Sequence, residues 1–369
     1  MSNLFAPIKI GPYALTHRVV MAPLTRMRSE AGDKPGALMR EHYAQRASHG
    51  GLIVGEATVV ADTGNGYLGS PGLYADDQIA GWQAVTDAVH AKGGRIFLQV
   101  FHAGRQSHVD MQPNGGSPVA PSAVQYEGVA YTANGWVPSS PHRALTEAEV
   151  VDMVQQFRRA AERGLKAGFD GVEIHGANGY LIDQFLQDGS NQRTDAYGGT
   201  IAKRARFLLD ITREIIDVWG ADRVAVRLGP SGSFGDMKDS DPEALFTYVA
   251  QQLDKLGIAY LHLIEPRVKG NSVDESRTQE PVAARLIRNH FRGTIIAAGG
   301  FERDTAQAVI AEGAADLVAF GRHFIANPDL PERLRENLPL NPYDRDTFYG
   351  GTERGYNDYP FHSKQVATA

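Results

Sequence analysis

The chain has 369 residues, 42% apolar and 22% charged, which is the composition of an ordinary globular protein and excludes a disordered one. The 37 basic and 43 acidic residues give a net charge of −6, which argues against nucleic acid or an anionic membrane as the main partner. No stretch approaches the roughly 20 apolar residues that span a bilayer. Residues 1–7 lack the features of a secretory signal, so we expect a cytoplasmic protein. Cysteine is absent, so redox chemistry would require a bound cofactor rather than thiols or a cysteine-held cluster.

One pattern recurs along the chain: a short apolar run, a turn and an amphipathic helix. Most of the runs are nearly continuously apolar, as expected of strands that are covered on both faces. Strands are predicted over residues 18–22, 52–56, 96–101, 171–175, 224–229, 260–264, 294–298 and 317–320.

The helices between these strands are clearest in the second half of the chain. Thr146 and Glu149 form a capping box ahead of a helical period that extends to Leu165. Asp241 and Pro242 similarly supply a cap and a first-turn proline. Eight such units without a clear linker predict a single α/β domain over residues 1–369, a (β/α)8 TIM barrel. An open, doubly wound sheet is the alternative.

Two segments interrupt the pattern. Residues 102–145, after the third strand, are rich in Gly, Pro and Ser and show no helical period, which is typical of a lid or binding excursion. The tail from Asn341 is too aromatic for a disordered end, so we expect it to dock on the barrel. Its aromatic residues are Phe348, Tyr349, Tyr356, Tyr359 and Phe361.

Two further motifs are rejected as ligand sites. Residues 64–69 fit the dinucleotide pattern G-x-G-x-x-G, but Ser70-Pro71-Gly72 follows where a helix would have to begin. This segment is interpreted as a substrate-side loop. The twelve histidines show no metal-ligand spacing, and we expect His42 and His49 on one helix face near the surface.

The carboxyl ends of barrel strands hold the chemistry in this fold, so the residues there are the candidates. The last two strands end in Gly299-Gly300 and Gly321-Arg322, where backbone N–H groups and a helix dipole could bind a phosphate. Glycines at such junctions are equally often ordinary turn residues. Thr25, Gln99 and Arg227 offer donors and acceptors suited to a planar heteroaromatic ring, although each alone could be structural. A phosphate and an amide-like ring together describe FMN.

The fourth strand end supplies a third group of candidates. His175 and Asn178 could donate hydrogen bonds to a substrate oxygen, and Tyr180 carries an acidic proton on a rigid ring. Each could also be an ordinary core or loop residue, but the three lie within six residues at one predicted barrel mouth.

The motifs recur in a fixed order over essentially the whole chain. They are Met21-Ala22-Pro23-Leu24-Thr25-Arg26, Glu56-Ala57-Thr58, Gln99 with His102 and Gly104-Arg105, residues 171–181 (GVEIHGANGYL), residues 193–199, Phe320-Gly321-Arg322 and Phe348-Tyr349-Gly350-Gly351. In this order they resemble the old yellow enzyme family of FMN-dependent ene-reductases. Two departures stand out. Thr25 stands where one subgroup has cysteine, and Phe101 replaces a tryptophan that is common in close relatives, which leaves the preferred substrate size open.

The resemblance implies roles for these residues. The flavin ring would be lined by Ala22, Pro23, Leu24, Thr25 and Ala57, with Gln99 at its pyrimidine edge and Arg227 beside N1 and the C2 carbonyl. The phosphate would lie at Gly299, Gly300, Gly321 and Arg322. His175 and Asn178 would bind the substrate carbonyl oxygen, and Tyr180 would donate the proton. The substrate pocket would be shaped by Tyr67, Phe101 and Tyr349.

The implied activity is reduction of the activated C=C bond of enones, enals and maleimides, with NADPH or NADH as hydride donor. Nitro compounds and nitrate esters are further candidate substrates. One alternative is a metal-free aldolase or isomerase barrel for a sugar phosphate, which needs a lysine or a carboxylate base at the barrel mouth, and the strand ends offer only Glu56 and Glu265. The other alternative is a flavin-binding sensor or scaffold without turnover.

Overall fold

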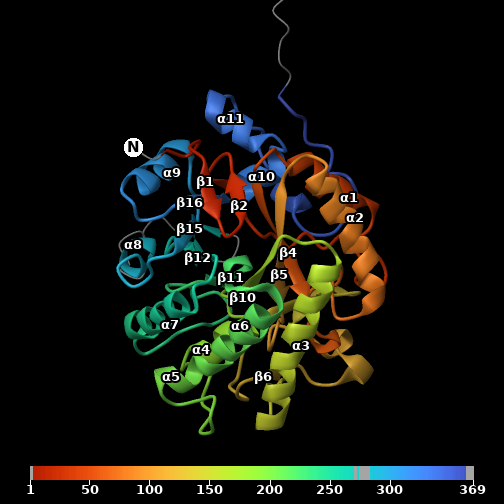
Figure 1. Cartoon of the computed structure of the whole chain (residues 1–369). Helices are drawn as coiled ribbons and strands as arrows, with labels where there is room; N and C mark the ends of the chain where they lie inside the picture. Colours follow the sequence, from red (N-terminus) through yellow and green to blue (C-terminus); the bar gives the residue numbers. More distant parts are fainter. Residues whose placement is uncertain (1–2, 270–271, 274–282, 363–369) are drawn as a thin grey trace, which may run out of the picture.

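The computed structural model describes residues 3–269, 272–273 and 283–362 (Figure 1). Eight parallel strands close into a barrel in the order β3-β4-β5-β10-β11-β12-β15-β16. The strands are β3 (Val19–Met21), β4 (Leu52–Val59), β5 (Arg95–Phe101), β10 (Gly171–Gly176), β11 (Val224–Leu228), β12 (Tyr260–Ile264), β15 (Thr294–Ala298) and β16 (Leu317–Phe320). All eight predicted strands are confirmed, and the closure of the sheet rules out the open, doubly wound alternative.

Helices surround the barrel and cover the outer faces of its strands (Figure 1). They are α1 (Ala37–Arg46), α2 (Ile79–His90), α3 (Glu147–Lys166), α4 (Leu181–Leu186), α5 (Ile201–Arg204), α6 (Arg206–Trp219), α7 (Pro242–Leu256), α8 (Ala284–Ile287), α9 (Arg303–Ala311), α10 (Arg322–Ala326) and α11 (Leu330–Glu336). The predicted capping box is present, because Thr146 Oγ1 accepts the Glu149 N–H at 3.2 Å and the Glu149 carboxylate accepts the Thr146 N–H at 2.8 Å. Within the described part of the chain, no helix is both long and apolar enough to cross a membrane.

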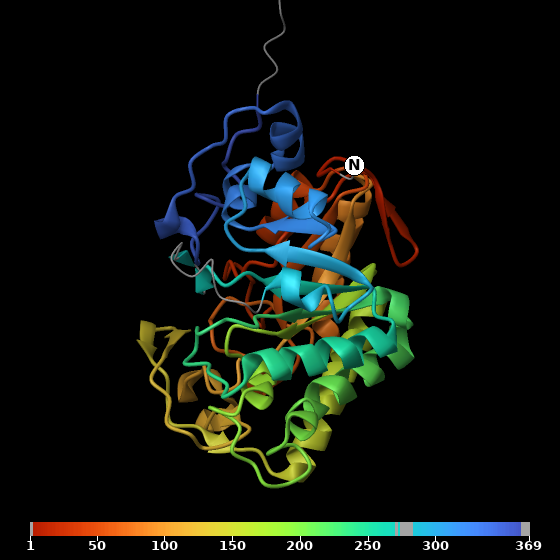
Figure 2. The same ribbon diagram turned by 90° about the vertical axis from the view of Figure 1, so that its left-hand side faces the viewer.

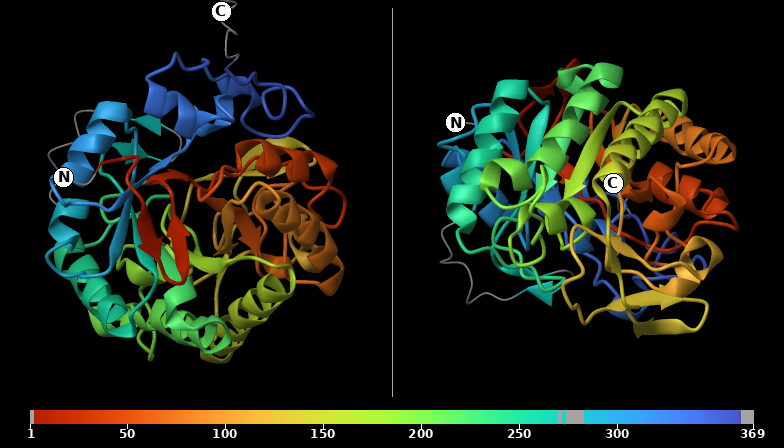
Figure 3. Two further views of the ribbon diagram at one scale, coloured as in Figure 1. Left: turned by 45° about the horizontal axis from the view of Figure 1, so that its top comes forward. Right: turned by 90° about the horizontal axis from the view of Figure 1, so that it is seen from below.

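A hairpin of β1 (Ile8–Ile10) and β2 (Tyr13–Leu15) plugs the amino-terminal end of the barrel. Ile10 and Leu15 belong to the same buried hydrophobic cluster as the barrel side chains of Phe97 and Leu317. Figure 3 shows the red hairpin over the centre of the ring of helices. Three-residue strands are too short for a periodicity to indicate them in the sequence.

The two irregular segments lie together at the other end of the barrel. The excursion contains the hairpin of β7 (Val129–Thr132) and β8 (Gly135–Pro138) and the short pair β6 (Val119–Ala120) and β9 (Arg143–Ala144). A further pair, β13 (Val268–Lys269) and β14 (Ser272–Val273), follows β12. Figure 2 shows the gold excursion and the blue tail on one side of the molecule and the red hairpin on the other.

The aromatic tail docks as predicted, and buried arginines hold it. Arg26 Nε donates to the carbonyl oxygen of Phe348 at 2.8 Å, and its Nη2 donates to that of Gly355 at 2.8 Å. The Tyr356 ring stacks on His42 with 3.9 Å between the ring centroids. Phe348 and Tyr356 are buried, whereas Phe361 stays exposed.

The expected surface position of His42 is therefore wrong. His42 is fully buried in α1, because the docked tail covers that face of the helix. His49 lies beyond the end of α1, so the two histidines share no helix face. The contact is made by a segment more than 300 residues away, which no local pattern around His42 could indicate.

Replacement of Arg46 is the strongest test of how the tail docks. Arg46 is buried and donates to the main-chain carbonyl oxygens of Phe324 at 2.9 Å, Ile325 at 2.6 Å and Tyr356 at 2.9 Å. Arg46→Ala should lower the free energy of unfolding by about 3 kcal/mol, because buried acceptors lose their donor. Denaturant titration followed by circular dichroism measures this loss. The matched control is Arg40→Ala on the exposed side of the same helix, and equal losses in the two variants would contradict the prediction.

Candidate active site

A cavity of about 760 Å³ opens at the carboxyl end of the barrel. This volume lies within the usual range for small-molecule and cofactor sites. Each barrel strand, or the loop that follows it, contributes lining residues, and Tyr126, Trp136, Phe348 and Tyr349 add side chains from the excursion and the tail. The convergence of separate strand ends on one rim is the arrangement that active sites of this fold use.

With one exception, every residue predicted for the site lines this cavity. These residues are Ala22, Pro23, Leu24, Thr25, Ala57, Tyr67, Gln99, His175, Asn178, Tyr180, Arg227, Gly299, Gly300, Gly321, Arg322 and Tyr349. The exception is Phe101, which is buried behind the wall. Its ring meets that of Tyr180 edge-on, with 4.5 Å between centroids and an interplanar angle of 87°. Phe101 therefore supports the Tyr180 ring rather than facing the cavity.

A tight turn presents the polar residues that follow β10. Asn178 and Gly179 both have positive φ, 58° and 68°, a combination that favours Asn-Gly. The Tyr180 N–H donates to the carbonyl oxygen of Ala177 across the turn at 3.4 Å. A Cβ on Gly179 would lie 2.7 Å from the carbonyl oxygen of Phe234, so a side chain there would force the loop apart.

Side chains from two other segments hold this turn in place. Asp183 Oδ2 accepts the Gly179 N–H at 2.9 Å, and Gln106 Nε2 donates to the carbonyl oxygen of Asn178 at 2.8 Å. Burial raises the pKa of Asp183 to about 7. The turn is thus held from both sides, which fixes Asn178 and Tyr180 relative to His175.

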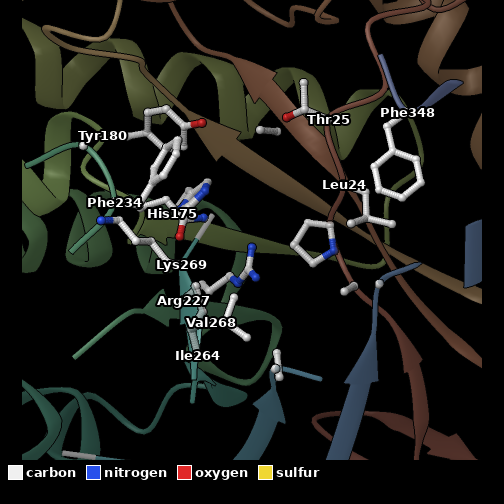
Figure 4. Close-up of a pocket in the computed structure, with 18 of the residues that line it drawn as sticks. Leu24, Thr25, His175, Tyr180, Arg227, Phe234, Ile264, Val268, Lys269 and Phe348 are labelled. Atoms are coloured by element: carbon white, nitrogen blue, oxygen red, sulfur yellow. The ribbon is translucent and has the colours of Figure 1, made fainter. Parts of the chain in front are cut away.

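His175 is set up as a neutral hydrogen-bond donor. Its Nδ1 accepts the Ala177 N–H at 3.3 Å, so the ring proton of the neutral form lies on Nε2. Burial, together with the charge of Arg227, holds the pKa of His175 well below its usual range. His175 can therefore donate from Nε2 without carrying a charge. Figure 4 shows its ring beside Arg227 in the cavity wall.

Tyr180 is a buried phenol that keeps its proton. Its hydroxyl donates to Tyr67 Oη at 3.2 Å, and Tyr67 Oη lies 3.5 Å from Gln106 Oε1. Burial raises the pKa values of Tyr180 and Tyr67 above that of free tyrosine. In Figure 4 Tyr180 and Thr25 lie on opposite sides of the cavity.

A bulge in β4 decides which of its side chains reaches the cavity. The pairing of β4 with β5 shifts between Val54 and Ala57, which sets Ala57 opposite Gln99. Glu56 is thereby turned outward to Tyr43, whose hydroxyl donates to Glu56 Oε1 at 3.2 Å. Burial raises the pKa of Glu56 to about 7. Neither Glu56 nor Glu265, the two carboxylates considered as the base of the aldolase alternative, lines the cavity.

The residues present fit FMN in both charge and shape. Arg227 Nε is buried and has no hydrogen-bond partner among the described residues, and in Figure 4 its guanidinium projects into the cavity. Such a group requires an acceptor or an anionic edge. Elsewhere in the cavity wall, a Cβ on Gly321 would lie 3.2 Å from Leu24 Cδ2, and Arg322 supplies a positive charge beside it. A cationic donor and a glycine-lined anion site in one cavity match an isoalloxazine and its phosphate.

Several lining residues were not predicted from the sequence. Phe234 comes from the loop after β11, where Gly229 to Ser233 contains only Gly, Pro and Ser. Because that loop follows a barrel strand, its position could have indicated that Phe234 lines the site. Trp136 and Tyr126 come from the excursion, where no periodicity assigns a direction to any side chain.

Comparison with known proteins agrees with this geometry. The sequence profile of the NADH:flavin oxidoreductase / NADH oxidase family matches residues 3–341. The chain is 46% identical over 360 residues to 12-oxophytodienoate reductase 1 of Oryza sativa subsp. japonica, covering 97% of this chain and 93% of that protein. Flavin oxidoreductase hxnT of Emericella nidulans is 45% identical over 383 residues, covering 98% of each chain.

Solved structures give the same result. Morphinone reductase in complex with tetrahydroNAD superposes with a TM-score of 0.91 at 46% identity, covering 98% of each chain. The old yellow enzyme homologue of Zymomonas mobilis superposes with a TM-score of 0.93 at 42% identity, covering 97% of this chain and 99% of that one. The chain therefore belongs to the old yellow enzyme family and is an FMN-dependent NAD(P)H oxidoreductase of the ene-reductase type.

Proposed function

We propose that the protein reduces the activated C=C bond of α,β-unsaturated carbonyl compounds, such as enones, enals and maleimides. The observation that carries this proposal is the shared cavity wall of His175, Asn178 and Tyr180, which offers two neutral donors and one buried phenol beside Arg227. Two relatives, named as reductases of 12-oxophytodienoate and morphinone, support the same class, since both names denote oxo compounds.

Bound FMN supplies the hydride chemistry between a nicotinamide and the β-carbon of the alkene. The residues that would hold the ring are Ala22, Pro23, Leu24, Thr25, Ala57, Gln99 and Arg227, and those at the phosphate are Gly299, Gly300, Gly321 and Arg322. Arg227 would place its positive charge beside the edge of the ring that becomes more negative on reduction, which would favour the reduced cofactor.

His175 and Asn178 bind and activate the substrate. When hydride adds to the β-carbon, negative charge accumulates on the carbonyl oxygen. The His175 Nε2–H and the Asn178 side-chain amide donate to that oxygen. His175 lies on β10 and Asn178 in the turn after it, and both positions are already fixed by hydrogen bonds. Donors placed in advance stabilise the transition state more than the ground state, which is the origin of the rate gain.

Tyr180 completes the reaction by passing its hydroxyl proton to the α-carbon, which forms the second new C–H bond. The phenolate that remains accepts a hydrogen bond from Tyr67, whose Oη lies 3.2 Å away. Tyr67 and Tyr349 pack edge-on against Trp136, at 6.1 and 5.8 Å between ring centroids. This aromatic wall suits an apolar substrate.

The test is anaerobic turnover of 2-cyclohexenone by the holoenzyme with NADPH or NADH, with the product identified by chromatography. We expect stoichiometric cyclohexanone, and the comparison of the two nicotinamides gives the preferred donor. A maleimide, a nitroalkene and a nitrate ester in the same panel define the substrate range. A flavin-loaded protein that is reduced by nicotinamide but consumes no alkene would contradict the proposal and favour the sensor or scaffold alternative.

A further inference from the structure

A fully buried carboxylate lies inside the barrel below the cavity. Glu173 is on β10, two residues before His175, and none of its side chain is exposed. Its Oε1 accepts Gln99 Nε2 at 2.8 Å, and its Oε2 accepts Tyr260 Oη at 3.0 Å and His262 Nδ1 at 2.9 Å. Burying a carboxylate costs several kcal/mol before its partners compensate. The proposed reaction uses Glu173 neither as an acid nor as a base.

Glu173 determines the orientation of the Gln99 side-chain amide. A carboxylate only accepts hydrogen bonds, so the amide must turn its NH₂ towards Glu173 and cannot be flipped without placing two oxygens together. Gln99 Oε1 is therefore directed away from Glu173. Gln99 lines the cavity, so it presents an acceptor there. An acceptor at this position matches the N3–H of a flavin.

Glu173 also acts on the charge of Arg227. The described residues include no hydrogen bond or ion pair between Arg227 and Glu173, because neutral donors from Gln99, Tyr260 and His262 occupy the carboxylate. The negative charge of Glu173 nevertheless favours the charged form of Arg227 and raises its pKa against the effect of burial. Glu173 thus compensates the charge of the guanidinium and leaves its N–H donors free for a ligand.

We propose that Glu173 is a positioning residue of the cofactor site, which fixes the orientation of the Gln99 amide and balances the charge of Arg227. It thereby sets both the affinity for FMN and the reduction potential of the bound cofactor. This inference rests on the cofactor roles of Gln99 and Arg227 given under the proposed function. Its test uses FMN binding without any alkene, so its failure is distinct from a failure to reduce enones.

The test compares Glu173→Gln with the unaltered protein in two measurements. In this variant the side-chain amide at position 173 offers its NH₂ to Gln99. The Gln99 amide therefore turns over, so that its oxygen accepts this hydrogen bond and its NH₂ is directed away. We expect FMN to bind the apoprotein at least about tenfold more weakly, which corresponds to one hydrogen bond to a polar edge. We also expect a more positive midpoint potential by spectroelectrochemistry, because one negative charge near the reduced cofactor is gone. Unchanged affinity together with unchanged potential would overturn the proposal.

An FMN analogue and two variants separate orientation from charge. N3-methyl-FMN lacks the N3–H donor. It should bind the unaltered protein much more weakly than FMN does, whereas in Glu173→Gln the difference in affinity between the two compounds should be much smaller. An equal difference in both proteins would exclude control of the amide. Glu173→Asp keeps the charge but shortens the reach to Gln99, so it should weaken FMN binding and leave the potential nearly unchanged. Tyr260→Phe removes a different hydrogen bond to Glu173 and is the control for general disturbance of the core.

Discussion

Replacing Tyr180 by Phe should slow the reduction of 2-cyclohexenone by at least about 100-fold, because a positioned general acid contributes that much or more. Reduction of the bound cofactor by NADPH should be nearly unchanged, since that half-reaction needs no proton from the phenol. Stopped-flow absorbance measures the two half-reactions separately. Tyr180 is protonated at neutral pH because burial raises its pKa, so the rate should show no loss from its ionisation between about pH 6 and 9.

Phenylalanine is the appropriate replacement because it keeps the ring that packs against Phe101. Tyr67→Phe is the matched control: it removes the hydroxyl next to Tyr180 Oη but not the proposed proton donor, so its effect on the enone step should be smaller. Equal losses in both half-reactions of Tyr180→Phe would indicate a disturbed site and contradict the assignment of Tyr180 as the acid.

The double replacement His175→Ala and Asn178→Ala should have an effect of similar or greater size. Two hydrogen bonds to a charged oxygen are each worth about 1.5–3 kcal/mol, so a bound phenolate such as that of 4-chlorophenol should lose at least about 100-fold in affinity. Enone reduction should fall by about 1000-fold, since both donors act on charge that develops in the transition state. Titration of the flavin absorbance with the phenol measures the first effect.

The pH dependence of phenol binding tests how His175 acts. Burial and Arg227 hold the pKa of His175 well below 6.5, so the ring stays neutral and no gain in affinity should accompany a fall in pH through 6.5. His175→Asn retains a donor and should recover part of the affinity lost in His175→Ala. Full affinity in the double alanine variant would place the substrate oxygen elsewhere in the cavity.

The barrel could be predicted from the sequence because the patterns that indicate its strands are local. A strand covered on both faces needs a continuous apolar run, and all eight runs became barrel strands. The Asn178-Gly179 pair has its own backbone preference for positive φ, so the turn that presents Tyr180 follows from two adjacent residues. A closed barrel then brings every strand end to one rim, which is why the candidate residues met in one cavity.

Other features depend on partners that are distant in sequence. The bulge in β4 turns Glu56 away from the rim and Ala57 into it, and Phe101 falls behind Tyr180 instead of lining the cavity. His42 is buried by a tail that follows it by more than 300 residues. The hydrogen bonds to the Glu173 carboxylate likewise come from two other strands, from Gln99 on β5 and from Tyr260 and His262 on β12.

The amino-acid sequence by itself determined the number and order of the strands, the Asn-Gly turn and the set of polar residues at the rim, because apolar periodicity and backbone preference act over a few neighbouring residues. Tertiary structure decided which side chains face the cavity, which are buried behind it, and which hydrogen-bond acceptors remain for a ligand. Those properties depend on the register between strands and on packing of remote segments, and neither is written in any short stretch of the chain.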